Sequence, residues 1–126
     1  MNFSTMRTRS KIMQSIRSFF HDHDYLEVDT PLLAPALIPE APIEIFQTDF
    51  NSAFHGGFPL YLIPSPEVHM KKLLAAGSGS IFQICRSFRN SEQIGPQHNP
   101  EFTMLEYYTV GAGYQESIAI TEALVE

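Results

Sequence analysis

The chain has 126 residues, of which 44% are hydrophobic and 17% charged, a composition typical of one globular domain or part of a larger one. Its 8 Lys and Arg against 14 Asp and Glu give a formal net charge of −6, which excludes an overall attraction to nucleic acid. The single cysteine, Cys85, excludes an internal disulfide framework. Without a signal-peptide pattern or a stretch long enough to span a bilayer, the sequence predicts a cytoplasmic chain with no membrane contact.

The N-terminal third predicts a helix, a strand and an extended connection. Residues 8–23 are expected to form the helix, because apolar residues recur there at spacings of three and four. These residues are Ile12, Met13, Ile16, Phe19 and Phe20. The segment "YLEVDTP" then alternates as a strand that ends at Pro31. Residues 31–42 contain four prolines, which favour a connection without regular structure.

The middle of the chain predicts two short strands and a second helix. Residues 43–50 and the segment "LYLIP" read as strands, with a turn at Gly56 and Gly57 between them. The segment "SPEVHMKKLLAAG" reads as a helix that Ser65 caps at its N-terminus and Gly77 ends.

The last third predicts a hairpin followed by a helix. Residues 81–89 and 101–109 both alternate with period two, and the loop of residues 90–99 between them is longer than a structural hairpin needs. The segment "YQESIAITEALVE" after it reads as a helix. Together these elements predict an α+β fold.

One face of the predicted hairpin has the chemistry of a binding site. Phe102, Glu106 and Tyr108 share that face, and Arg89 joins them if it lies on the same side. A guanidinium binds phosphate or carboxylate, an aromatic ring stacks on a base, and a carboxylate binds an ammonium group. With His98 within reach of a phosphate tail, these groups suit a nucleotide and an amino-acid-like ligand. Spacing alone is equally compatible with a solvated sheet face.

Other polar residues predict less. A carboxylate in the first turn of a helix, as at Glu67, is favoured by the helix dipole without any ligand. The run His21–His23 has metal-binding residue types, but neighbouring helical residues point to different faces, so no metal site is expected. Cys85 and His69 are expected to be packing or surface residues, because neither has a visible catalytic partner.

The combined motifs resemble those of a known family. "SFRN…HNPEFTMLEYY" is similar to motif 2 of the class II aminoacyl-tRNA synthetases of the lysyl branch, and "IMQSIRSFFHDHDYLEVDTP" is similar to their motif 1. "SPEVHMKKLLAAG" and "FQICRSFRN" look most like the lysyl-tRNA-synthetase paralogue that ligates lysine to elongation factor P. The resemblance covers residues 8–126, and it implies an antiparallel sheet flanked by helices.

This resemblance implies a site for adenylation, in which ATP and a carboxylate give an acyl-adenylate and pyrophosphate. Arg89 would be the catalytic residue, binding the α-phosphate and the amino-acid carboxylate. The implied ATP-binding residues are Arg89, Glu92, His98, Asn99 and Phe102, and the implied amino-acid-binding residues are Glu67, Glu106 and Tyr108. Lysine or β-lysine would be the amino acid, and elongation factor P the acceptor. Motif 1 would form a homodimer interface.

Three departures from the family pattern shape the expectation. The family usually has Glu two residues after the motif 2 arginine, whereas Ser91 stands there and the glutamate is Glu92. No anticodon-binding barrel precedes motif 1, which favours the ligase and makes tRNA an unlikely partner. Motif 3 and the acidic magnesium ligands are missing, so residues 1–126 are expected to be the N-terminal portion of a catalytic domain, with its Mg²⁺ ligands outside this chain and no activity in isolation.

Two alternative functions stay open. One is a fragment of a tRNA-charging lysyl-tRNA synthetase, which the acidic charge balance disfavours. The other is a non-catalytic dimerisation or nucleotide-binding module.

Overall fold

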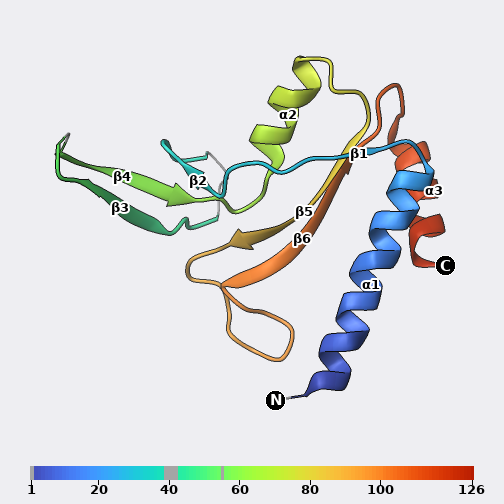
Figure 1. Ribbon diagram of the computed structural model, residues 1–126, viewed down its shortest axis with the longest axis horizontal. Coiled ribbons are helices and arrows are strands. Elements are labelled where there is room, and N and C mark those ends of the chain that lie inside the picture. The colour runs from blue at the N-terminus through green and yellow to red at the C-terminus, as the bar shows by residue number, and fades with distance from the viewer. Residues whose placement is uncertain (1, 39–42, 55) are drawn as a thin grey trace.

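The computed structural model describes residues 2–38, 43–54 and 56–126 (Figure 1). In chain order the elements are α1 (Phe3–Asp22), β1 (Leu26–Glu27), β2 (Leu33–Ala34), β3 (Gln47–Ser52), β4 (Gly56–Leu62), α2 (Glu67–Ala75), β5 (Ile81–Phe88), β6 (Glu101–Tyr108) and α3 (Tyr114–Val125). The strands form two three-stranded sheets, ordered β1-β5-β6 and β2-β4-β3. The fold is therefore α+β, although β1 runs parallel to β5 rather than antiparallel.

Helix α1 begins at Phe3, earlier than the apolar periodicity predicts. The side chain of Asn2 caps it, because Asn2 Oδ1 accepts hydrogen bonds from the backbone nitrogens of Ser4 at 3.1 Å and Thr5 at 3.5 Å. Within the described ranges, no helix is both long and apolar enough to cross a bilayer.

The main core lies between the helices and one face of the β5–β6 hairpin. Phe20, Tyr25 and Phe82 are its buried residues, and the rings of Phe20 and Phe82 stack with their centroids 4.7 Å apart. Partly buried side chains from α1, α3, β5 and β6 surround them, namely Ile16, Phe19, Ile84, Leu105, Tyr107, Ile120 and Leu124. Helices α1 and α3 thus cover one face of the hairpin (Figure 1), which leaves the other face for polar groups.

The second sheet has its own small core of Ala34, Ile38 and Ile63. It corrects three expectations. The proline-rich segment contains the short strand β2, the strand expected over residues 43–50 lies at 47–52, and Gly56 and Gly57 open β4 instead of forming the turn. Gly56 pairs with Ser52, so the chain reverses between them. Residues 39–42 and 55 fall outside the described residues.

Helix α2 ends as predicted and starts one residue later. Its N-cap is Pro66 rather than Ser65, and Pro66 makes no side-chain capping hydrogen bond, because its ring carries no polar side-chain atom. At the other end, Gly77 has a φ of +89°. The backbone nitrogen of Gly77 donates to Leu74 O at 2.9 Å and that of Ser78 to Leu73 O at 3.1 Å, the Schellman arrangement that favours glycine.

Candidate functional site

The polar face of the β5–β6 hairpin is set by its register. The two strands pair antiparallel from Ile81 opposite Tyr108 to Phe88 opposite Glu101, which confirms the predicted hairpin. In this register Ser87 lies opposite Phe102, and the pairing continues beyond the strands because Arg89 N donates to Pro100 O at 2.9 Å. Arg89 therefore shares a face with Phe102, as the site hypothesis requires.

Arg89 is held in place by an aromatic ring. Its Cζ lies 5.1 Å from the centroid of the Phe102 ring, within the range of a cation–π interaction. Its Nε is buried and has no hydrogen-bond partner. In the part of the chain that the structure describes, Arg89 forms no ion pair. A fixed guanidinium with a buried, unused donor is suited to an anionic ligand.

The residues expected to bind a nucleotide line one pocket of ≈ 310 Å³. Arg89, Glu92, His98, Asn99 and Phe102 all contribute to its wall, together with Gln97 and Thr103. The loop that carries four of these seven residues folds back on itself, since Gly95 N donates to His98 O at 3.0 Å. Thr103 was missed by the sequence reasoning, because strand alternation assigns it to the opposite face.

The other end of this face carries Glu106 and Tyr108, and the charge of Glu67, at the start of α2, reaches it. Tyr108 Oη donates to Glu106 Oε1 at 2.6 Å. Burial of the phenol raises the pKa of Tyr108 far above its usual range, and the hydrogen bond to Glu106 and the charges of Glu106 and Glu67 add to the shift. The negative charge of Glu67 opposes ionisation of this phenol, so Glu67 belongs to one electrostatic cluster with Glu106 and Tyr108. Glu67 also forms an ion pair with Lys71 one turn along α2.

Gln83 is a buried polar residue that the sequence reasoning did not single out. It lies opposite Glu106 and is 1% exposed. Its Oε1 accepts a hydrogen bond from Thr30 Oγ1 at 3.0 Å, and its Nε2 has no partner. The available signal was a glutamine among the apolar residues of the first half of β5.

Cys85 lies between the two ends of the face and is buried. Burial raises the pKa of its thiol, a shift that a contact with Ser87 opposes and the charges of Glu106 and Asp29 increase. A thiol with a raised pKa is a poor nucleophile at neutral pH, so we assign Cys85 no chemical step.

The described residues contain no group of three or more His, Cys, Asp or Glu side chains that could hold a metal ion. In the run His21–His23, the two imidazoles have other partners: His23 Nδ1 donates to Phe19 O at 2.7 Å, and His21 Nε2 lies 3.6 Å from Glu27 Oε2.

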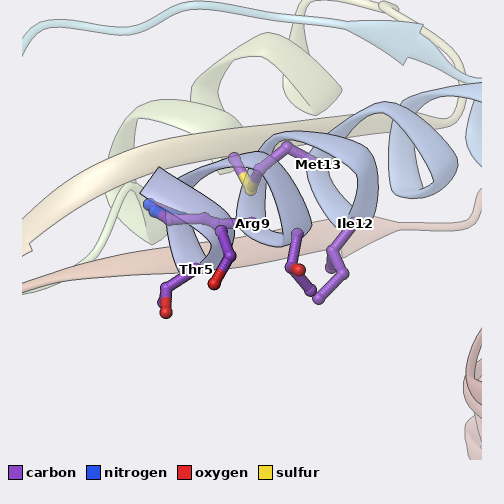
Figure 2. A pocket seen from close by; sticks show the side chains of 6 residues that line it. Thr5, Arg9, Ile12 and Met13 are labelled. Atoms are coloured by element: carbon purple, nitrogen blue, oxygen red, sulfur yellow. The ribbon is translucent and has the colours of Figure 1, made fainter. Parts of the chain in front are cut away.

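A hollow of ≈ 400 Å³ lies elsewhere, along the N-terminal half of α1. Figure 2 shows that its lining side chains, Thr5, Arg9, Ile12 and Met13 among them, all come from this one helix. Arg9 Nη2 donates to Thr103 Oγ1 at 2.6 Å and so ties the helix to β6. The hollow has no carboxylate or histidine in its wall, and we assign it no chemistry.

Comparison with known proteins gives a consistent picture. Residues 2–126 match the family described as tRNA synthetases class II (D, K and N). The chain is similar to proteins named elongation factor P–(R)-β-lysine ligase. It is 44% identical over 122 residues to that of Vibrio atlanticus (strain LGP32), covering 96% of this chain and 38% of the relative. For the protein of Sodalis glossinidius (strain morsitans) the identity is 55% over 101 residues, covering 79% and 31%. For that of Haemophilus ducreyi (strain 35000HP / ATCC 700724) it is 54% over 108 residues, covering 85% and 33%. The chain thus spans about a third of the length of these relatives.

Proposed function

Because the chain belongs to the class II tRNA synthetases (D, K and N), we propose that its β5–β6 face serves the ATP-dependent activation of lysine or β-lysine. The product would be an acyl-adenylate, and the acceptor elongation factor P, which appears in the names of its relatives. The observation that carries the proposal is the placement of Arg89 over Phe102, in a pocket shared with Glu92, His98 and Asn99.

The chemistry of these side chains assigns each of them a part in binding ATP and in the reaction. The adenine stacks on Phe102, while Arg89 binds an oxygen of the α-phosphate and the carboxylate of the amino acid. That carboxylate attacks the α-phosphorus, the bond between the α- and β-phosphates breaks, and pyrophosphate leaves. Arg89 stabilises the charge that develops at phosphorus, and Glu92, His98 and Asn99 position the nucleotide. The step requires no covalent enzyme nucleophile.

The acidic residues at the other end of the face favour a basic amino acid as the substrate. Glu67, Glu106 and Tyr108 form an acidic cluster that attracts ammonium groups, with Glu67 assigned to the α-ammonium and Tyr108 to the side chain. Aspartate, another amino acid of this family, would place a third carboxylate beside Glu67 and Glu106. Repulsion between like charges therefore disfavours aspartate, whereas the ammonium groups of lysine or β-lysine are attracted.

The described residues provide no group of three or more His, Cys, Asp or Glu side chains that could hold magnesium, so none of them is assigned to the ion.

We also propose that the chain forms a homodimer through its motif 1 segment, α1 and β1. Large apolar side chains on these elements are exposed: Phe3 by 65%, Ile12 by 54% and Leu26 by 56%. Association of two copies would remove this apolar surface from water. Analytical ultracentrifugation of the chain and of Ile12→Glu tests this proposal. A dimer that Ile12→Glu dissociates supports it, and a wild-type monomer at all concentrations contradicts it.

Calorimetric titration with ATP tests the proposed nucleotide end. We expect Arg89→Ala to weaken binding at least about tenfold, since charge-assisted hydrogen bonds are lost. Arg86→Ala is the matched control: Arg86 lies on β5, three residues before Arg89, and faces the other side, where its Nε is 3.5 Å from Glu101 Oε1. Equal affinities for wild type and Arg89→Ala would contradict the proposal.

Exchange of pyrophosphate into ATP tests the proposed amino-acid site, and it is measured on the full-length gene product because residues 1–126 are expected to be inactive in isolation. Each of lysine, (R)-β-lysine, aspartate and asparagine is supplied in turn, with ATP binding measured beside it. Exchange with a basic amino acid, lost in Glu106→Gln, supports the proposal, and exchange with aspartate contradicts it. Transfer of the activated amino acid to elongation factor P or to lysine tRNA then separates the ligase from the tRNA-charging alternative.

A further inference from the structure

The loop between β5 and β6 is fastened at its start to the segment that precedes β3. Asn90 and Glu44 form an isolated antiparallel bridge, in which Asn90 N donates to Glu44 O at 2.9 Å. Ser91 Oγ donates to the Glu44 carboxylate at 2.6 Å. The side-chain bond joins residues 47 positions apart in the sequence, and the backbone bond joins Glu44 to the residue just before Ser91.

Ser91 adopts an unusual backbone conformation at this point. Its φ of +56° lies in the left-handed region, which a side chain other than glycine, asparagine or aspartate seldom adopts. Its backbone nitrogen donates to Asn90 Oδ1 at 3.0 Å, so the turn is also bonded locally. The side-chain bond to Glu44 offsets part of the cost of this conformation, and a glycine at this position could not form that bond.

The fastening lies next to the proposed nucleotide pocket. Glu44, Asn90 and Ser91 line a hollow of ≈ 300 Å³ whose wall also includes Arg89 and Glu92. Arg89 and Glu92 are likewise in the wall of the nucleotide pocket. The turn at Ser91 is therefore the segment that determines where Glu92 lies relative to Arg89.

We propose that Glu44 and Ser91 form a latch that positions Glu92 for the nucleotide, and that Glu44 is thus a positioning residue outside the hairpin. This inference rests on the proposed function for its ligand, ATP, but the latch itself is a property of the ligand-free chain. Glu44 acts through Ser91 and needs no contact with the nucleotide.

Hydrogen exchange of the ligand-free chain tests the latch separately from ATP binding. We expect backbone amides of residues 90–94 to exchange about fivefold faster in Glu44→Ala and in Ser91→Ala, and no faster again in the double variant, because one hydrogen bond is lost in each case. Glu44→Gln keeps an acceptor oxygen for Ser91 and should restore the wild-type rate. Glu101→Ala removes an exposed carboxylate at the other end of the loop and is the control, and amides of β5 report whether each variant is folded.

ATP titration of the same variants tests the positioning role. We expect Glu44→Ala and Ser91→Ala to raise the Kd for ATP about fivefold, and Glu44→Gln to restore it. Unchanged loop exchange in both alanine variants overturns the latch. Faster exchange with an unchanged Kd overturns the positioning role. If the wild type binds no ATP, the proposed function and with it the positioning role fail, whereas the exchange result still decides whether the latch exists.

Discussion

The two hairpins of this protein use the same antiparallel pairing in opposite environments. Five of the eight residues of β5 are buried, whereas β3 and β4 have no fully buried residue along their described lengths. In Figure 1 the β3–β4 hairpin projects away from α1 and α3, while the β5–β6 hairpin lies against them. The aromatic pair of the β3–β4 hairpin, Phe50 and Phe58, is 47% and 46% exposed.

This difference in burial explains why the candidate site lies on the β5–β6 hairpin. A guanidinium and a carboxylate keep a fixed geometry only if the backbone beneath them is fixed. The helices fix β5 and β6 from one side, so the opposite side can hold Arg89, Phe102, Glu106 and Tyr108 in register. The described residues of β3 and β4 are exposed or only partly buried, and we assign them no chemistry.

The largest expected effect is at the centre of the main core. Phe82→Ala should lower the free energy of unfolding by about 3–5 kcal/mol, because it removes a ring that stacks on Phe20 and leaves a cavity. Chemical denaturation followed by circular dichroism measures the change. A loss below 1 kcal/mol would show that the β5–β6 hairpin is no better supported than β3–β4.

Two glycines with positive φ, one after the end of α2 and one at the start of β4, give a smaller effect. Gly77 and Gly56 have φ values of +89° and +73°, and an added Cβ would meet no atom within 4 Å at either position. Gly77→Ala should cost about 1–2 kcal/mol, the penalty of the left-handed conformation alone. Gly56→Ala should cost less, because the end of an exposed hairpin relaxes locally. Equal losses in denaturation midpoints at constant slope would contradict this distinction.

The ionisation of Tyr108 reports on burial and charge at the site face of the β5–β6 hairpin. We expect Glu106→Gln to lower the pKa of Tyr108, because it removes the charge that opposes the phenolate. Phenolate absorbance across an alkaline titration measures this, with Tyr108→Phe identifying the signal among the five tyrosines.

The same shift makes a prediction about stability. A phenol whose folded pKa is raised binds its proton more tightly in the folded state. Its contribution is therefore complete below the ordinary pKa of tyrosine and is lost as the pH rises through the folded value. Wild type should lose stability faster than Tyr108→Phe above that ordinary pKa, and parallel curves would contradict the assignment.

The smallest effect is expected on the projecting hairpin. The rings of Phe50 and Phe58 are 4.9 Å apart, and exposed cross-strand pairs contribute less than about 1 kcal/mol. Phe50→Ala should therefore leave the denaturation midpoint nearly unchanged. A loss comparable with that of Phe82→Ala would remove the contrast between the hairpins.

Sequence patterns predicted the elements whose signals are local. Alternation identified the β5–β6 hairpin and the common face of Phe102, Glu106 and Tyr108, because side-chain direction in a strand depends only on position. That Arg89 shares this face depends on the register between the two strands, which the structure supplies. The end of α2 was also predicted, from the glycine that its backbone requires. The roles of the site residues came from the family resemblance and stay predictions.

Other features depend on contacts distant in sequence and were not predicted. The parallel pairing of β1 with β5 and the bond between Ser91 and Glu44 join segments that no local pattern relates. The N-cap of α2 was assigned to Ser65 because serine is a good cap in isolation, whereas the structure begins the helix after Pro66. The early start of α1 at Phe3 was missed because the apolar periodicity begins later than the cap at Asn2.

The position of β6 at the end of its sheet has a consequence for handling the protein. In the described ranges, β6 pairs with β5 alone, so the backbone groups along its other edge have no neighbouring strand. Eight residues long and rich in aromatic side chains, β6 can template the addition of an extended segment from another molecule. Solutions of this chain should therefore become increasingly prone to sheet-type aggregation as concentration rises, and a proline at an outward-facing amide of β6 should counteract it.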